Sequence, residues 1–251
     1  MTNSETKVSK KYSDREGDCY RALVAAVRSG NIPDIDILAQ LPLYTPRVVL
    51  AHQLFLDEIY RQILDVPGAI AEFGVRWGRN LASFHSLRSI YESNNMSRHI
   101  YGFDTFAGFP SISERDGHDP VTQVGGLDVP EGYLGSLEEI LYAHQGLSMR
   151  PDHKRFHLVK GDVCETLPKQ IEDNPHLIFA LCYIDVDLYE PSKAVIKAVW
   201  ERTPKGGILA FDEINLDLFP GETLAMLECI DIAAHTLKRS KVATYTAYVV
   251  K

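Results

Sequence analysis

Five short apolar runs, separated by segments with helical periodicity, constrain the fold of this chain more than any other feature. The runs are rich in Ile, Val, Phe and Leu, as expected of buried strands. Strands that alternate with helices imply right-handed crossovers and a parallel sheet. The expected strands span 69–75, 99–104, 156–162, 177–185 and 207–214, and the expected helices span 80–91, 136–143, 191–202 and 222–235. The sequence therefore predicts an α/β, Rossmann-like domain, with a mostly parallel central sheet and helices on both faces.

The segments on either side of this pattern have their own character. Residues 1–17 are polar and are expected to be frayed, and helices are expected at 18–29 and 46–64. We therefore divide the chain into an N-terminal helical extension, 1–67, and a main domain, 68–251. Near the C-terminus, residues 244–250 form an aromatic, β-branched run with no helix after it, which predicts an antiparallel strand at the sheet edge.

One connection is too long for an ordinary strand-to-helix loop. Residues 109–135 are dense in Gly, Pro, Asp and Ser, and they follow the second expected strand. This position places them over the carboxyl end of the sheet. We expect the segment to be a lid that covers a substrate, with a plain surface excursion as the alternative.

Composition excludes several classes of protein. The chain has 34 acidic and 26 basic residues and a net charge of -8, which argues against a nucleic-acid-binding surface. No stretch approaches the ~20 apolar residues of a membrane span, and the N-terminus lacks the apolar core of a signal peptide. The four cysteines are scattered. We therefore expect a cytoplasmic protein with reduced, mostly buried thiols and no nucleic-acid or membrane partner.

Candidate ligand-binding residues lie where the first three strands end. In open α/β sheets, ligands bind beyond the carboxyl ends of the strands. The run A-E-F-G-V-R-W-G-R-N carries Glu72, with Gly74 and Gly78 in the following turn. Asp104 ends the second strand, where it can accept the ribose hydroxyls of a nucleoside, and Asp162 ends the third, where it can meet an adenine amino group. The alternative for the glycine turn is a tight bend without a ligand, and the alternative for Asp104 is a cap for the segment that follows it.

The fourth and fifth strands leave more carboxylates at the same edge. Asp185 and Asp187 follow the fourth strand, and Asp212 and Glu213 follow the fifth. Acids gathered there would raise one another's pKa unless a positive charge offset them. Hard oxygen ligands favour Mg²⁺, Mn²⁺ or Ca²⁺ over zinc. The alternative is that one or two of these acids only cap the following helices.

Several other polar side chains are weaker candidates for the pocket. Three histidines in or near the lid can act as bases or substrate contacts, although a solvent-facing or satisfied histidine is commoner. Three residues before the first strand have the same standing. These six residues are His118, His144, His153, Tyr44, Arg47 and His52.

These runs, in this order, resemble the macrocin O-methyltransferase family, whose enzymes methylate sugar hydroxyls of macrolides and related antibiotics. The resemblance covers most of residues 68–230 and carries no signature of one acceptor. It rests on A-E-F-G-V-R-W-G-R-N, G-F-D-T-F-A-G-F-P, K-G-D-V-C-E-T-L-P, I-D-V-D-L-Y-E-P-S and P-K-G-G-I-L-A-F-D-E. It implies a Rossmann-like class I methyltransferase domain that uses S-adenosylmethionine and a divalent metal ion, Mg²⁺ or Mn²⁺/Ca²⁺. It also implies a homodimer or higher homo-oligomer formed through residues 18–64.

The resemblance also implies roles for individual residues. Asp185, Asp212 and Glu213 are the implied metal ligands and Asp187 the implied general base. The cofactor's methionine part is implied to meet the glycine turn, its ribose Asp104, and its adenine Asp162 with Val163. The full expected cofactor set is Glu72, Gly74, Val75, Gly78, Asn80, Asp104, Thr105, Asp162, Val163 and Asp185.

Two departures from the family pattern leave rival functions open. The family usually has Asp-Asp where this chain has Asp212-Glu213, and W-x-G-G-S where this chain has R-W-G-R-N, which brings Arg79 and Asn80 to the cofactor. A catalytically inactive S-adenosylmethionine-binding homologue is therefore one alternative. A nicotinamide-dependent Rossmann oxidoreductase is the other, although the G-x-G-x-x-G of dinucleotide enzymes is missing. The expected acceptor is a small molecule with a hydroxyl, most of all one that contains a sugar.

Overall fold

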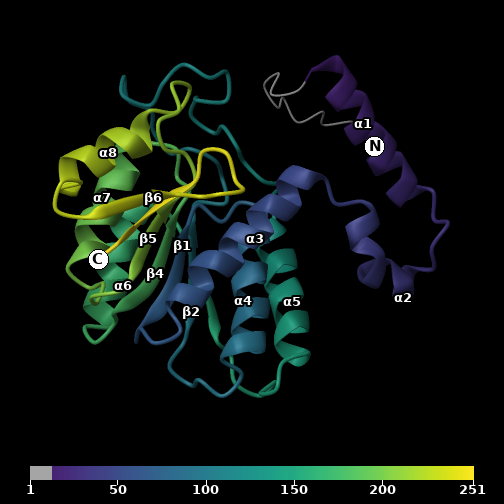
Figure 1. Ribbon diagram of the computed structural model, residues 1–251, viewed down its shortest axis with the longest axis horizontal. Coiled ribbons are helices and arrows are strands. Elements are labelled where there is room, and N and C mark those ends of the chain that lie inside the picture. The colour runs from purple at the N-terminus through teal and green to yellow at the C-terminus, as the bar shows by residue number, and fades with distance from the viewer. Residues whose placement is uncertain (1–12) are drawn as a thin grey trace.

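A computed structural model describes residues 13–251 and contains a seven-stranded sheet with helices on both faces (Figure 1). The strands are β1 (Ala69–Phe73), β2 (Ile100–Asp104), β3 (Phe156–Lys160), β4 (Phe179–Ile184), β5 (Ile208–Phe211), β6 (Thr236–Arg239) and β7 (Ala247–Val250). The helices are α1 (Asp14–Arg28), α2 (Asp34–Ile37), the 3₁₀-helix η1 (Leu38–Leu43), α3 (Arg47–Gln62), α4 (Arg79–Tyr91), α5 (Tyr133–Gly146), α6 (Val163–Asp173), α7 (Tyr189–Trp200) and α8 (Gly221–Cys229).

The strand order is β3-β2-β1-β4-β5-β7-β6, and β1 to β5 are mutually parallel. This confirms the predicted Rossmann-like α/β fold and all five core strands. The C-terminal run forms β7 and pairs antiparallel with β5, as predicted. It is not the edge, however, because β6 pairs with its other side and completes the sheet.

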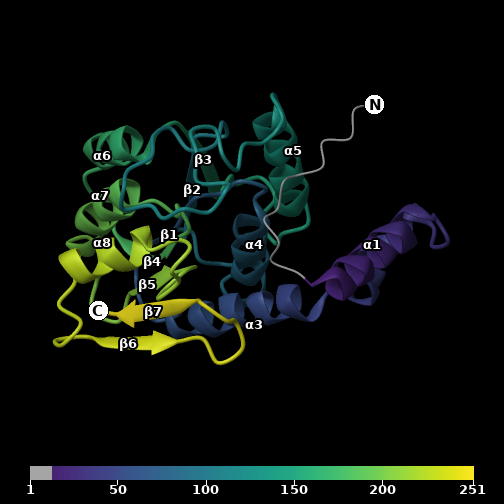
Figure 2. The ribbon, with the colours of Figure 1, turned by 90° about the horizontal axis from the view of Figure 1, so that it is seen from above.

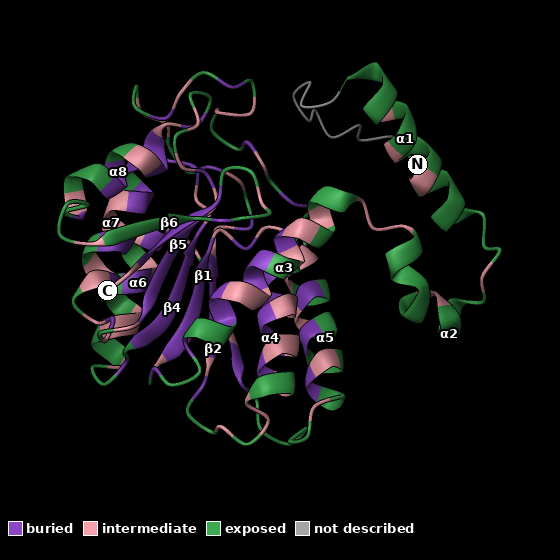
Figure 3. Cartoon of the chain, viewed as in Figure 1, coloured by how far each residue is buried: buried purple, intermediate pink, exposed green. Residues whose placement is uncertain are grey.

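Two layers of helices bury the sheet. One core lies between the sheet and helices α3, α4 and α5, and it includes Phe55 from α3, Phe84 from α4 and Leu141 from α5. The other core lies under α6, α7 and α8, and it includes Leu167 and Val195. Figure 3 shows the central strands buried along their length between these layers. Helix α6 had not been predicted, and α8 ends at Cys229, six residues before the expected end at residue 235.

The N-terminal helices project away from the sheet as an arm, which we define as residues 14–43 (Figure 1, Figure 2). Helix α1 begins four residues earlier than predicted because Ser13 and Glu16 form a capping box. None of the residues in α1, α2 or η1 is buried, and apolar side chains such as Ile35 and Leu38 are largely exposed. The expected fraying of residues 1–17 concerns mainly residues 1–12, which lie outside the described part of the chain.

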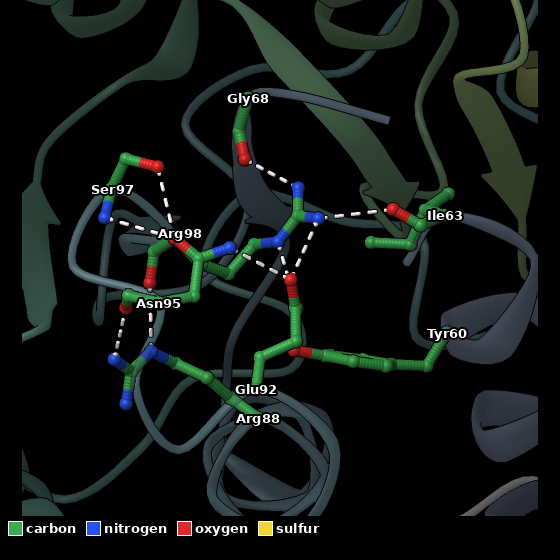
Figure 4. Close-up of polar contacts among 8 residues, drawn as sticks. All are labelled: Tyr60, Ile63, Gly68, Arg88, Glu92, Asn95, Ser97 and Arg98. Atoms are coloured by element: carbon green, nitrogen blue, oxygen red, sulfur yellow. Dashed lines mark hydrogen bonds and ion pairs between the residues drawn. The ribbon is translucent and has the colours of Figure 1, made fainter. Parts of the chain in front are cut away.

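Arg98, just before β2, joins elements at the amino-terminal edge of the sheet (Figure 4). Its guanidinium donates to both carboxylate oxygens of Glu92, at 2.9 and 3.0 Å, and to the carbonyl oxygens of Ile63 and Gly68. The Tyr60 hydroxyl donates to the same carboxylate at 2.6 Å. Because Arg98 is 1% exposed, this network ties α3, the turn before β1 and the end of α4 together away from solvent.

The described thiols and helices test two expectations from composition. The four cysteines are unpaired, as expected, but only Cys182 is buried, while Cys19 is exposed on α1. The expectation of mostly buried thiols was therefore wrong. Within residues 13–251, no helix combines the length and apolar character that crossing a membrane requires.

Candidate active site

The carboxyl ends of five parallel strands bring the predicted site residues to one edge of the sheet. The register pairs Glu72 on β1 with Gly102 on β2 and with Tyr183 on β4. Beyond the strands, the ladder continues from the Asp185 amide to the Phe73 carbonyl at 2.8 Å and from the Asp212 amide to the Ile184 carbonyl at 3.0 Å. The strand order therefore places Asp162, Asp104, Gly74, Asp185 and Asp212 along this edge in that sequence.

The turn after β1 approaches its neighbours too closely for side chains. Gly74 has φ +92°, and a β-carbon there would overlap the carbonyl oxygen of Asp185. Gly78 has φ +77° and precedes α4, and a β-carbon there would overlap the side chain of Leu137. Val75, between them, is buried in the core. Both glycines are thus required by the backbone, and their amides donate to the carbonyl oxygens of Phe103, at 2.9 Å, and Val75, at 2.8 Å.

Glu72 is a buried carboxylate beneath this turn. Burial raises its pKa well above that of an ordinary glutamate, and interactions with Asn80 and Arg79 oppose that shift. Its Oε2 atom has no hydrogen-bond partner among residues 13–251. A buried acceptor without a donor is costly, so this oxygen favours a ligand that brings a donor.

Asp104, at the tip of β2, organises the backbone around it. Its Oδ2 accepts the Arg76 amide at 2.7 Å and its Oδ1 accepts the Phe106 amide at 2.6 Å. A carboxylate has about four acceptor positions, so two remain for other donors. The neighbouring Thr105 hydroxyl donates to the carbonyl oxygen of Gly108 at 2.7 Å and so braces the start of the lid.

Asp162, at the tip of β3, caps a helix. Its Oδ1 accepts the Cys164 amide at 2.9 Å, at the beginning of α6, and Val163 is the first residue of that helix. This capping role had not been predicted, and the contact of Asp162 with an adenine stays a prediction. The two roles are compatible because a cap occupies only one acceptor oxygen.

Asp185 and Asp212 form the centre of an acidic cluster. Burial first, then the negative charges of Asp212 and Asp187, raise the pKa of Asp185 well above that of an ordinary aspartate. The Tyr183 hydroxyl donates to Oδ1 of Asp212 in a short hydrogen bond. These acids therefore lie close enough to interact, which is the arrangement that the strand-tip prediction required.

Sequence reasoning missed Glu222, which lies in the first turn of α8 and is fully buried. Its Oε1 accepts the amides of Val186 and Asp187, at 3.1 and 3.2 Å, and its Oε2 accepts the Glu213 amide at 3.3 Å. Burial, followed by the charges of Asp187 and Asp212, raises the pKa of Glu222 well above its usual range. In the sequence it looked like an ordinary first-turn acid.

His52 on α3 reaches the same cluster. Its Nδ1 lies 4.0 Å from Oδ1 of Asp212, and its Nε2 lies 2.7 Å from Oδ1 of Asn80. Arg79 approaches the same ring nitrogen at 3.3 Å. Burial and the charge of Arg79 lower the pKa of His52. The predicted pocket residue His52 thus joins the turn after β1 to the acidic cluster.

The other weak candidates lie elsewhere. Tyr44 directly follows η1. Arg47 is the first residue of α3, and its side chain is exposed. His118 and His153 are exposed, and His144 lies on α5 with its ring 6.2 Å from that of His85.

The acidic cluster is not arranged as a preformed cage. Among residues 13–251, no three His, Cys, Asp or Glu side chains lie in a geometry that would hold a metal ion as they stand. Asp185 and Asp212 do fit one requirement of a cation site, because their mutual repulsion would fall when a positive charge binds between them. Glu213 is buried, and its role as the third metal ligand stays a prediction.

The lid segment was predicted at 109–135, and the long connection from β2 to α5 spans 105–132, so the last three predicted lid residues belong to α5 instead. It is anchored to the site rather than free of it. Asp116 is buried, and its Oδ1 accepts the Tyr189 amide at the start of α7, at 2.6 Å. A β-carbon on Gly117 would overlap the carbonyl oxygen of Leu218 and lie 2.9 Å from Cδ of Pro220. The lid therefore contacts the loops that carry the acidic cluster.

Comparisons with known proteins agree with this geometry. The model of the macrocin O-methyltransferase (TylF) family matches residues 52–221. The crystal structure of CalS11, calicheamicin methyltransferase, is 38% identical with a TM-score of 0.93, and the match covers 100% of this chain and 98% of that one. The apo structure of CalS11, described as TDP-rhamnose 3′-O-methyltransferase, is 37% identical with a TM-score of 0.84, and covers 95% of both chains.

A more distant structure shows the same fold. The O-methyltransferase NovP is 17% identical with a TM-score of 0.60, and covers 80% of this chain and 79% of that one. No curated protein sequence matches the chain. The family match favours methyl transfer over the nicotinamide-dependent alternative, which had rested on the sheet alone. The matched range, 52–221, includes every strand tip described above, and the chain therefore belongs to the macrocin O-methyltransferase family of enzymes.

Proposed function

We propose that this enzyme transfers a methyl group from S-adenosylmethionine to a hydroxyl of a sugar, with a nucleotide-linked deoxysugar of the TDP-rhamnose type as the acceptor. The observation that carries the proposal is the 38% identity with CalS11 over the whole chain, together with acids after four of the five parallel strands, at one edge of the sheet. CalS11 itself is described as acting on TDP-rhamnose.

The residues at the sheet edge fit the cofactor. The partnerless oxygen of Glu72 and the remaining acceptor positions of Asp104 are complementary to the ammonium group of an amino acid and to the hydroxyls of a ribose. The proposed cofactor set is the predicted one: Glu72, Gly74, Val75, Gly78, Asn80, Asp104, Thr105, Asp162, Val163 and Asp185. When bound, S-adenosylmethionine supplies a methyl group already activated by its sulfonium.

The chain itself has to place the acceptor oxygen and remove its proton. A sugar hydroxyl is a poor nucleophile near pH 7, so a base beside it accelerates the transfer, typically by ~10²–10⁴-fold. Asp187 is the proposed base, because it follows β4 directly beside Asp185 and its charge reaches that residue. The lid, which is anchored beside Asp187 through Asp116 and Tyr189, would exclude water from the acceptor.

We also propose a divalent cation, Mg²⁺ before Mn²⁺ or Ca²⁺, held by Asp185 and Asp212 with Glu213 as the third ligand. When bound, such an ion supplies a positive charge that lowers the pKa of the acceptor hydroxyl. What supports it is the clustering of negative charge around Asp185, which burial and neighbouring acids make unfavourable without a counter-charge.

The arm, residues 14–43, supports the proposed homo-oligomer. Its helices bury no side chain within the chain, and isolated helices shorter than about 12–15 residues are marginal in water. A second copy of the chain would cover Ile35, Leu38 and Leu43, whose side chains are 85%, 73% and 63% exposed.

Sedimentation of the full chain and of an Ile35→Asp/Leu38→Asp variant tests the proposed homo-oligomer. We expect the variant to shift toward the monomer.

The cytoplasmic location of the protein also remains a prediction.

The central experiment measures methyl transfer from labelled S-adenosylmethionine to TDP-rhamnose, free rhamnose and a catechol, with Mg²⁺ or with EDTA. We expect transfer to TDP-rhamnose, and its loss in EDTA with recovery on adding Mg²⁺. Asp187→Asn should lower kcat by ~10²–10⁴-fold while cofactor affinity stays nearly unchanged. The exposed Asp217→Asn is the matched control.

Each proposal has its own contrary result. Equal loss of kcat and of cofactor affinity in Asp187→Asn would refute its role as base. Full activity in EDTA would refute the cation. Tight binding of the cofactor with no transfer to any acceptor would instead support the alternative of a catalytically inactive homologue. The departures from the family pattern at Glu213 and Arg79 had suggested that alternative.

A further inference from the structure

The backbone at Asp187 adopts an uncommon conformation. Asp187 has φ +59°, and the Leu188 amide donates to the Val186 carbonyl oxygen at 2.6 Å, so the three residues form a γ-turn of the positive-φ kind. Such turns are rare and strained, because a side chain disfavours a positive φ. The surrounding structure must therefore hold this turn.

One carboxylate holds the turn from α8. Glu222 accepts the amides of Val186 and Asp187 through one oxygen and the amide of Glu213 through the other, so it joins the ends of β4 and β5. The start of α8 fits closely against the turn. A β-carbon on Gly221 would lie 2.7 Å from the carbonyl oxygen of Asp187 and 2.6 Å from the amide nitrogen of Tyr189.

A second carboxylate holds the turn from the lid. Asp116 accepts the Tyr189 amide at 2.6 Å through Oδ1 and the Ser113 amide at 2.5 Å through Oδ2. Its side chain is 2% exposed, so water competes little for these bonds. Together with the bond inside the γ-turn, the two carboxylates account for every amide from Val186 to Tyr189.

We propose that Asp116 and Glu222 are positioning residues that clamp the γ-turn and so fix Asp187 for methyl transfer. The proposal rests on the proposed role of Asp187 as base. Neither clamp residue touches the acceptor; each acts through the backbone that carries Asp187. Because Asp116 belongs to the lid, the clamp also makes the position of Asp187 depend on the position of the lid.

Glu222→Gln and Asp116→Asn test the clamp. Each substitution keeps the shape of the side chain but replaces one acceptor oxygen by an NH₂ group, which faces a backbone amide that also donates. We expect kcat with TDP-rhamnose to fall roughly 10²-fold, as for a misplaced catalytic group, while the Kd of S-adenosylhomocysteine changes less than about twofold. The matched control is Glu190→Gln, an exposed acid in the first turn of α7.

A double-mutant comparison separates positioning from general destabilisation. If the clamp acts only through Asp187, then Glu222→Gln added to Asp187→Asn lowers kcat less than about twofold further. A full additional loss in that background would overturn the proposal. If Glu222→Gln fails to fold, Asp116→Asn carries the same comparison from the opposite side of the turn.

Amide exchange provides a readout that does not need activity. Hydrogen exchange of a peptide that spans 185–189 should be at least about tenfold faster in each clamp variant than in the wild type or in Glu190→Gln. Unchanged exchange would overturn the clamp whether or not an acceptor is found. If the wild-type protein transfers no methyl group, then the proposed function fails, and the exchange result still decides whether the two carboxylates hold the turn.

Discussion

The Nδ1 atom of His52 lies 4.0 Å from Oδ1 of Asp212, although the first residue belongs to a helix before the sheet and the second follows its fifth strand. The Nε2 atom of His52 also forms a hydrogen bond with Oδ1 of Asn80 at 2.7 Å. One imidazole ring therefore links the proposed cofactor turn to the proposed cation site. Burial and Arg79 lower its pKa, so this link is a neutral ring at pH 7.

This relationship predicts the effect of replacing His52. His52→Ala removes the shorter of the two hydrogen bonds to the buried Asn80 oxygen, the other being the one from Arg79 at 3.3 Å, and a lost partner costs about 1–3 kcal/mol at a buried polar group. The Kd of S-adenosylhomocysteine should rise by about tenfold in calorimetry, because Asn80 would lose its orientation. His52→Gln can still donate to Asn80 and should restore most of the affinity. Equal affinity for wild type and His52→Ala would show that Asn80 does not contact the cofactor.

Gly74 offers a sharper test of the cofactor turn. Gly74→Ala would place a β-carbon on the Asp185 carbonyl oxygen at a residue with φ +92°, so the turn would have to move. We expect loss of measurable S-adenosylhomocysteine binding. Gly135→Ala on α5 is the matched control, because nothing lies within 4 Å of its β-carbon position and alanine favours helices by about 1 kcal/mol. That control should bind normally and melt at the same or a higher temperature.

The Arg98 network predicts a large stability effect remote from the site. Arg98→Met would leave the carboxylate of Glu92 without its buried partner, which typically costs about 3–5 kcal/mol. For a chain of this size, Tm should fall by on the order of 10 °C in a thermal melt. Arg61→Met, which breaks an exposed pair with Asp57 at 3.8 Å, should change Tm by no more than about 2 °C. Similar melting of both variants would contradict the importance of the network.

The contact between His99 and His157 predicts how stability depends on pH. Their ring nitrogens lie 3.0 Å apart, and burial lowers the pKa of His157 to about 4. In an unfolded chain a histidine titrates near pH 6.5, so between these values the unfolded state binds a proton that the folded state does not. The contribution of His157 is therefore fully present above about pH 6.5 and is lost as pH falls toward about 4.

His157→Gln isolates this contribution. The glutamine does not titrate, so its Tm should fall less between pH 6.5 and 4.5 than that of the wild type. A comparison between variants is needed because Asp185 and Glu222, whose pKa values are raised, make the folded state less stable as pH rises. His118→Gln, at an exposed lid position, should follow the wild-type profile. Parallel wild-type and His157→Gln profiles would disprove the interpretation.

Periodicity and strand-end chemistry predicted much of this molecule. The five parallel strands and the edge that gathers Asp104, Asp185 and Asp212 follow from five apolar runs, four of which end in an acid. The missed elements lack such a signal. All four residues of β6 are exposed, so no alternation marks them as a strand, and α6 contains Pro168, which reads as a break.

Glu222 and Asp116 were missed for a different reason. Each lies beside a Pro-Gly or Asp-Gly segment where an acid is expected as a cap or turn residue, so residue type alone gave no signal. Their role comes from which amides they accept, and those amides belong to loops distant in sequence. The segments that resemble the macrocin O-methyltransferase family likewise identified Asp187 as a candidate base, but they did not predict the conformation of its backbone.

The positive φ of Asp187 decides which substitution is informative there. Asparagine and aspartate tolerate a left-handed backbone far better than alanine or β-branched residues do. Replacing Asp187 by alanine would therefore remove the carboxylate and also destabilise the turn. The measured loss of activity would then overstate the contribution of the carboxylate. The same backbone bias narrows what evolution can place at this position, because a replacement must suit the turn before its chemistry matters.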